Sequence, residues 1–115
     1  MTQIQEVRTE AITRVQIARY AGAVGDFNPM HVDEEFAKAA GMDSVIAHGP
    51  LTIALAIDAV VAQVGGDRMR AFDARLRAPV GPGDQLTITS TEAGIDVSTA
   101  SGSVATAAVQ FGEAQ

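Results

Sequence analysis

The sequence of 115 residues contains no cysteine, and this absence excludes several kinds of chemistry. Without cysteine the chain forms no disulfide framework, offers no thiol nucleophile and holds no cysteine-ligated metal. Aromatic residues are also scarce, because there is no tryptophan and only one tyrosine and four phenylalanines. A core built mainly from small aliphatic side chains gives a small domain little stability of its own. We therefore expect one domain, residues 1–115, with modest stability of its own.

Positive charge is in short supply too, since 8 Lys and Arg residues stand against 14 Asp and Glu residues, for a net charge of −6. Nucleic-acid binding requires a basic surface, so a nucleic-acid partner is not expected. Half of the basic residues nevertheless lie between Arg68 and Arg77. They form either the solvated face of a strand or a contact surface for phosphate groups or an acidic protein, with Arg75 and Arg77 as the candidates.

Long apolar runs are limited to one segment, residues 51–64, in which only Thr52, Asp58 and Gln63 are polar. A membrane-spanning helix needs about 20 residues, so this segment is too short to cross a bilayer. A helix that is apolar on nearly every side is expected to be buried on every side, and we expect a curved sheet to wrap around it. The N-terminal residues lack the charged and apolar pattern of a signal peptide, which predicts a cytoplasmic protein with no membrane partner.

The remaining patterns predict an α+β fold. Uneven alternation indicates a first strand within residues 2–11, and Thr13 begins a capping box for a helix over residues 14–24. Asp33 is suited to cap a short helix that Gly41 ends. Alternating apolar and polar residues predict strands in four later segments: 72–78, 86–89, 95–97 and 105–111.

An acid and an imidazole lie close together in the segment between the first two helices. Asp26 follows Gly25, a natural helix stop, and Pro29 cannot continue a helix, so residues 26–31 are expected to form a tight irregular turn. Such a turn can aim the side chains of Asp26 and His31 at one point, whereas residues five apart on a straight helix diverge. A histidine exchanges protons near neutral pH, so the pair suits acid and base chemistry.

The long apolar helix is expected to begin at Gly49, with Pro50 at a position where a missing N–H costs nothing. The first N–H groups of a helix lack intrahelical partners, and the helix dipole places partial positive charge there. The Gly49 N–H, which no side chain shields, can therefore stabilise a carbonyl oxygen that becomes negative during a reaction. His48 is interpreted as structural, as a cap or a packing residue.

A metal site is the alternative interpretation of part of this region. His31, Asp33 and Glu34 carry ligand atoms, but one histidine with adjacent carboxylates is weak ligand spacing. The two acids also suit the positive end of a helix, which explains them without an ion. We therefore expect no metal.

Two motifs resemble those of a known family. The run Gly25-Asp26-Phe27-Asn28-Pro29-Met30-His31, followed by Ala47-His48-Gly49, is similar to the hydratase 2 motif of the MaoC-like hot-dog proteins. That family comprises (R)-specific enoyl-CoA hydratases and (3R)-hydroxyacyl thioester dehydratases. Segments 45–49, 77–80 and 82–84 resemble it too, so the likeness covers most of the chain. It implies a hot-dog fold, in which a curved antiparallel sheet wraps around a central apolar helix.

The resemblance also implies an activity, that of a hydro-lyase of fatty-acid metabolism. Such an enzyme reversibly hydrates trans-2-enoyl thioesters to (3R)-3-hydroxyacyl thioesters. Asp26 and His31 would activate the water, and the Gly49 N–H would bind the thioester carbonyl. Asn28 would support the site by orienting it or its turn.

No separate cofactor is expected, because coenzyme A or the phosphopantetheine of an acyl carrier protein enters as part of the substrate. Its phosphates are the groups that Arg75 and Arg77 would contact. Family members pair their sheets into dimers, so the expected partner is a second copy or a related hot-dog subunit.

Two alternatives stay open: a hot-dog acyl thioesterase, and a non-catalytic subunit that binds an acyl thioester. A thioesterase needs a carboxylate placed at the carbonyl carbon, whereas Asp26 with His31 suits chemistry at C2 and C3. A non-catalytic subunit is expected to lack the acid or the base, and this sequence contains both.

Overall fold

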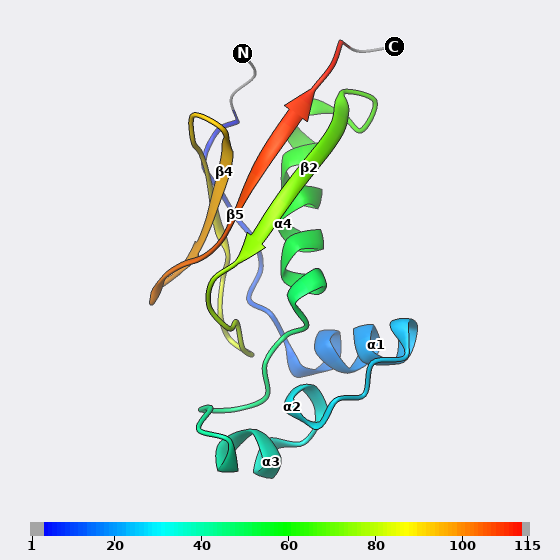
Figure 1. Cartoon of the computed structure of the whole chain (residues 1–115), viewed down its shortest axis with the longest axis vertical. Coiled ribbons are helices and arrows are strands. Elements are labelled where there is room, and N and C mark those ends of the chain that lie inside the picture. The colour runs from blue at the N-terminus through cyan, green and yellow to red at the C-terminus, as the bar shows by residue number, and fades with distance from the viewer. Residues whose placement is uncertain (1–3, 114–115) are drawn as a thin grey trace.

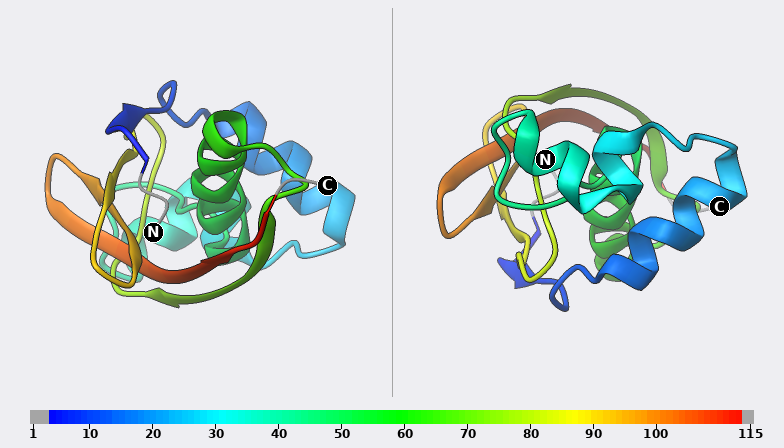
Figure 2. Two further views of the ribbon diagram at one scale, coloured as in Figure 1. Left: turned by 90° about the horizontal axis from the view of Figure 1, so that it is seen from above. Right: turned by 90° about the horizontal axis from the view of Figure 1, so that it is seen from below.

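The central element of the computed structural model, which describes residues 4–113, is the long helix α4, Gly49–Val64. A curved sheet lies along one side of this helix, and the other helices gather at the end where it begins (Figures 1 and 2). These helices are α1 (Arg14–Val24), α2 (Pro29–Val32) and α3 (Glu34–Ala39). The strands are β1 (Val7–Arg8), β2 (Met69–Leu76), β3 (Thr87–Ser90), β4 (Gly94–Thr99) and β5 (Gly102–Phe111).

The five strands form one antiparallel sheet in the order β1-β3-β4-β5-β2. The register shifts once in β2, between Met69 and Ala71, and once in β4, between Val97 and Ser98. Such irregularities increase local twist and bend, which fits a sheet that curves around a helix. Strand β2 is an edge strand, so one side of its backbone pairs with no other strand among residues 4–113.

The core lies between α4 and the concave face of the sheet. Leu51, Ala56 and Val60 of α4 are buried, and the sheet contributes buried aliphatic side chains that include Ile88 and Val97. Burying a side chain of this size stabilises the fold by about 1.5–3 kcal/mol. The architecture is the α+β arrangement that the sequence predicts.

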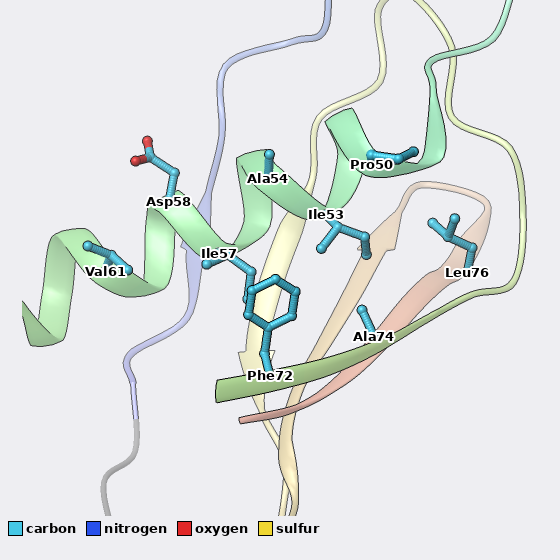
Figure 3. A pocket seen from close by; sticks show the side chains of 9 residues that line it. All are labelled: Pro50, Ile53, Ala54, Ile57, Asp58, Val61, Phe72, Ala74 and Leu76. Carbon is cyan, nitrogen blue, oxygen red and sulfur yellow. The ribbon is translucent and has the colours of Figure 1, made fainter. Parts of the chain in front are cut away.

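Helix α4 is not buried on every side in this single chain, which corrects the prediction from its apolar composition. Ala54, Asp58, Ala62 and Gln63 are exposed along its outer face. An apolar groove of about 690 Å³ runs between this face and β2 (Figure 3). It is lined by Pro50, Ile53, Ala54, Ile57, Asp58, Val61, Phe72, Ala74 and Leu76. The carboxylate of Asp58, one of these lining residues, points away from β2 (Figure 3).

Several local predictions are confirmed. Thr13 caps α1, since its hydroxyl accepts a hydrogen bond from the Gln16 N–H at 3.0 Å, and Asp33 caps α3. Within residues 4–113 no helix has both the length and the apolar character needed to cross a membrane. The first strand, however, is only Val7–Arg8, and residues 2–3 of the predicted strand lie outside the described part.

Strand β2 is also less buried than its alternation predicts. Phe72 and Leu76, expected on the buried side, are 48% and 52% exposed. The reason is that β2 borders the open groove beside α4 instead of lying against a closed core. An edge strand with apolar side chains over an open groove is typical of a surface that another molecule covers.

Candidate active site

Asp26 lies immediately after α1, at a point where the backbone reverses. Gly25 ends the helix with φ 74°, a left-handed conformation that glycine adopts without strain. The Asp26 N–H donates to the Ala21 carbonyl at 3.0 Å, and the Asp26 carboxylate accepts a hydrogen bond from the Asn28 N–H at 3.2 Å. The exposed carboxylate is thus oriented by its own loop.

The segment that follows is more regular than the irregular turn that the sequence predicts. Pro29–Val32 forms the short helix α2, and Asn28 caps it by accepting a hydrogen bond from the Met30 N–H at 3.0 Å. Proline suits the first turn of a helix, so here it begins the element instead of preventing one. Asn28 therefore supports the site through the backbone that carries His31.

His31 has a defined hydrogen-bond partner on one ring nitrogen. Its Nδ1 lies 2.7 Å from the Ile46 carbonyl oxygen, and since a carbonyl only accepts, Nδ1 carries the proton. In the neutral ring Nε2 then holds a free lone pair, and no residue of the described chain bonds to it. This arrangement prepares Nε2 to accept a proton.

His48 lies against both Asp26 and His31. Its Nε2 donates to the backbone carbonyl of Asp26 at 3.0 Å, and its ring stacks on that of His31 with centroids 3.7 Å apart and planes 22° from parallel. Tyr20 covers another side, with ring centroids 4.9 Å apart. His48 is 2% exposed and makes no side-chain cap for α4, so of the two structural roles expected it has the packing one.

The acid and the imidazole converge as the spacing predicts. Side-chain ligand atoms of Asp26, His31 and His48 all lie within 4.8 Å of one another. Their catalytic roles remain predictions, but the loop places the Asp26 carboxylate and an imidazole nitrogen of His31 within reach of one small molecule such as water.

A metal ion fits this cluster poorly. The two imidazole rings are nearly parallel, so their lone pairs run side by side and do not converge on one ion at the roughly 2.0–2.1 Å that zinc requires. The acids of the alternative interpretation are engaged elsewhere: Asp33 caps α3, and Glu34 forms an ion pair with Arg14.

Gly49 is the first residue of α4 and borders a pocket of about 340 Å³. The pocket is lined by His31, Ile46, Ala47, Gly49, Thr52, Leu76, Arg77, Ala78, Pro79 and Val80. The helix N-terminus and the proposed base therefore share one cavity. Asp26 does not line the pocket but lies beside His31.

Two lining residues, Thr52 and Leu76, lie outside the motif segments of the sequence. Thr52 is 2% exposed and lies three residues after Gly49, a spacing that puts both on one helix face and could have indicated it. Leu76 comes from β2, and no local signal connects it to Gly49.

The two arginine candidates lie in different places. Arg77 lines the pocket that also contains His31 and Gly49. Arg75 borders a separate pocket of about 220 Å³ with Asp73 and Thr106. Since successive side chains along a strand alternate between its two faces, residues 75 and 77 share a face only while the strand is regular, and β2 ends at Leu76.

The similarity of the chain to known proteins decides its family. Residues 2–113 match the family model described as MaoC like domain. The chain belongs to this family. The matched region includes the segment that carries Asp26 and His31 and all of the described residues, 4–113, so the family predicted from the motifs is confirmed.

Among curated proteins, the chain is 42% identical over 65 residues to "Enoyl-CoA hydratase 2, peroxisomal" of Arabidopsis thaliana, which covers 54% of this chain and 21% of that protein. It is 38% identical over 74 residues to "Probable dehydratase NIT22" of Ajellomyces capsulatus, covering 62% of this chain and 20% of that protein. The chain thus spans about a fifth of the length of these relatives.

Solved structures agree on the fold. The (R)-hydratase from A. caviae superposes with a TM-score of 0.78 at 22% identity, covering 95% of this chain and 94% of that one. The ChsH1-ChsH2 complex from Mycobacterium tuberculosis gives 0.77 at 21% identity, covering 96% and 94%. The MaoC-like chain therefore has the hot-dog fold that the resemblance implied.

Proposed function

We propose that this MaoC-like domain catalyses the reversible hydration of trans-2-enoyl thioesters to (3R)-3-hydroxyacyl thioesters. The observation that carries the proposal is the convergence of Asp26 and His31 beside the pocket where α4 begins. The names of the Arabidopsis thaliana hydratase and the A. caviae (R)-hydratase support it, as does the family. A role in fatty-acid metabolism follows from this reaction class.

The site's proton chemistry follows from the hydrogen bonds. Because Nδ1 of His31 is held as a donor by Ile46, Nε2 accepts a proton from a water that the Asp26 carboxylate also binds. The water's oxygen bonds to C3 of the enoyl group while one O–H bond of the water and the π bond between C2 and C3 break. The proton returns to C2, so atoms balance and both side chains end as they began.

Negative charge develops on the thioester oxygen as the hydroxyl adds to C3. The Gly49 N–H at the first position of α4 has no partner within the described chain, and the helix dipole adds positive potential there. A donor fixed before the reaction stabilises the enolate-like transition state without reorganisation.

The two parts of the substrate, the phosphate-bearing carrier and the acyl chain, have separate candidate surfaces. The phosphates of coenzyme A or phosphopantetheine would meet Arg77, the cation at the pocket. The acyl chain would extend into the apolar groove between α4 and β2, which shares Leu76 with the pocket. A second hot-dog subunit covering β2 would close this groove into a channel, and the ChsH1-ChsH2 complex supports such a pairing.

The deciding assay uses purified protein and crotonyl-CoA. We expect loss of the enoyl absorbance without release of free thiol, and a product that is the (3R) enantiomer on chiral analysis. Thiol release with the enoyl absorbance retained would identify a thioesterase instead. No change with either CoA or carrier-protein substrates, alone or with a related subunit, would contradict catalysis.

A further inference from the structure

We infer that His48 is the positioning residue of this site: it holds the Asp26 loop, the His31 ring and the start of α4 in one arrangement. The inference rests on the proposed function for its kinetic consequence, but its structural content stands on contacts alone. His48 does not line the pocket and is almost completely buried, so it touches no substrate and acts through its neighbours.

The hydrogen bond from His48 to Asp26 is the first support. The N–H groups of Gly25 and Asp26 donate to the Ala21 carbonyl, and the other local hydrogen bonds of residues 25–28 join close neighbours in sequence. Within the described chain, the bond from His48 Nε2 to the Asp26 carbonyl is the one that ties this exposed loop to a distant segment, 22 residues away. Without it the carboxylate would be positioned by local contacts only.

The stacked ring is the second support. The plane of the His31 imidazole is set at its edge by the Ile46 carbonyl and on its face by the His48 ring, 3.7 Å away. A hydrogen bond at one nitrogen still allows rotation about its axis, whereas a flat neighbour restricts it. His48 therefore fixes the direction in which His31 Nε2 presents its lone pair.

The third support is chain connectivity. His48 directly precedes Gly49, the residue whose N–H would bind the thioester oxygen. One side chain thus connects the acid, the base and the oxyanion donor, so a shift of any one is opposed by the other two. Misplacement by about 1 Å can cost about 10²-fold in rate, which is why such a connector matters.

A buried nitrogen of His48 without a hydrogen-bond partner argues that this residue does more than fill space in the core. His48 Nδ1 is buried without a hydrogen-bond partner among the described residues, and an unsatisfied buried polar atom is destabilising. An apolar side chain of the same size would fill the space without that cost. The feature that an apolar residue could not supply is the Nε2–H donor to Asp26.

Two substitutions separate the donor from the ring. His48→Phe keeps a flat ring for His31 but removes the donor, and His48→Gln keeps an N–H at similar reach but removes the ring. With crotonyl-CoA, we expect His48→Phe to lower kcat on the order of 10²-fold with KM unchanged. We expect His48→Gln to recover part of that loss, which a merely structural role would not produce.

Nitrogen NMR of the histidine rings in the full wild-type chain tests the contact independently of folding of the variants. We expect His48 as the Nε2–H tautomer and His31 as the Nδ1–H tautomer. The opposite tautomer at His48, or a His48→Phe variant with wild-type kcat, overturns the inference. An inactive wild type with the expected tautomers would instead contradict the proposed function and leave the hydrogen-bond assignment standing.

Discussion

The side chain of Leu76 lies against the Cα of Gly49, so closely that a Cβ at position 49 would collide with the leucine's Cδ1. These residues come from the end of β2 and the first position of α4. Leu76 lines both the pocket that contains His31 and the apolar groove beside α4. It therefore lies at the boundary between the two cavities, beside the amide that would bind the proposed thioester oxygen.

Substituting Gly49 with alanine is expected to lower kcat, because the new methyl displaces the end of the Leu76 side chain beside the helix N-terminus. Leu76→Ala should relieve the collision, so Gly49→Ala will cost less unfolding free energy in that background than in wild type. Chemical denaturation of both single variants and the double variant measures this coupling. Strict additivity of the two effects would show that the contact is absent in solution.

Leu76→Ala should also alter the enzyme's preference for acyl-chain length, because the smaller side chain widens the passage between the pocket and the groove. We expect the kcat/KM ratio of a longer enoyl-CoA, such as the eight-carbon one, to crotonyl-CoA to rise. Phe72→Ala, at a groove position that does not line the pocket, serves as the matched control and should widen the groove without opening the passage. An unchanged ratio in Leu76→Ala would place the acyl chain elsewhere.

The two arginines offer a matched pair because they lie at different pockets. Arg77→Ala is expected to raise KM for an enoyl-CoA several-fold with little change in kcat, since a phosphate contact away from the reacting atoms contributes to binding. The effect should shrink as salt is added. Arg75→Ala should leave KM unchanged, and an equal rise for both variants would indicate a general charge effect.

The open edge of β2 predicts an assembled state. We expect light scattering after size exclusion to give twice the chain mass for the protein alone, or with a related subunit when both are present. Phe72→Glu should favour the monomer, because it places a charge on a half-exposed apolar position of that edge. Ala100→Glu, in the exposed turn between β4 and β5, adds the same charge as a control. An unmutated protein that stays monomeric both alone and with a related subunit would contradict the prediction.

Local chemistry explains what the sequence could predict. Gly25 ends α1, Thr13 and Asp33 cap their helices, and the approach of Asp26 to His31 follows from a short loop between helices. These features depend on residues within a few positions of one another, where capping and turn preferences act directly.

The rest depends on contacts between distant segments. The bond from His48 to the Asp26 carbonyl and the contact between Leu76 and Gly49 have no counterpart in local patterning. The prediction that α4 is buried on every side is wrong for a related reason. Apolar composition indicates that a helix will be covered, but it does not say whether its own chain or a second subunit covers it.

The claim that Asp26 and His31 form the catalytic pair is tested most directly by the hydration rate of Asp26→Asn. Its control is Asp33→Asn, a change of the same type at an exposed helix cap, where asparagine caps as well as aspartate. We predict that Asp26→Asn lowers kcat for crotonyl-CoA by about 10²-fold or more with unfolding unchanged, while Asp33→Asn keeps wild-type turnover. Near-wild-type hydration by Asp26→Asn would contradict the account.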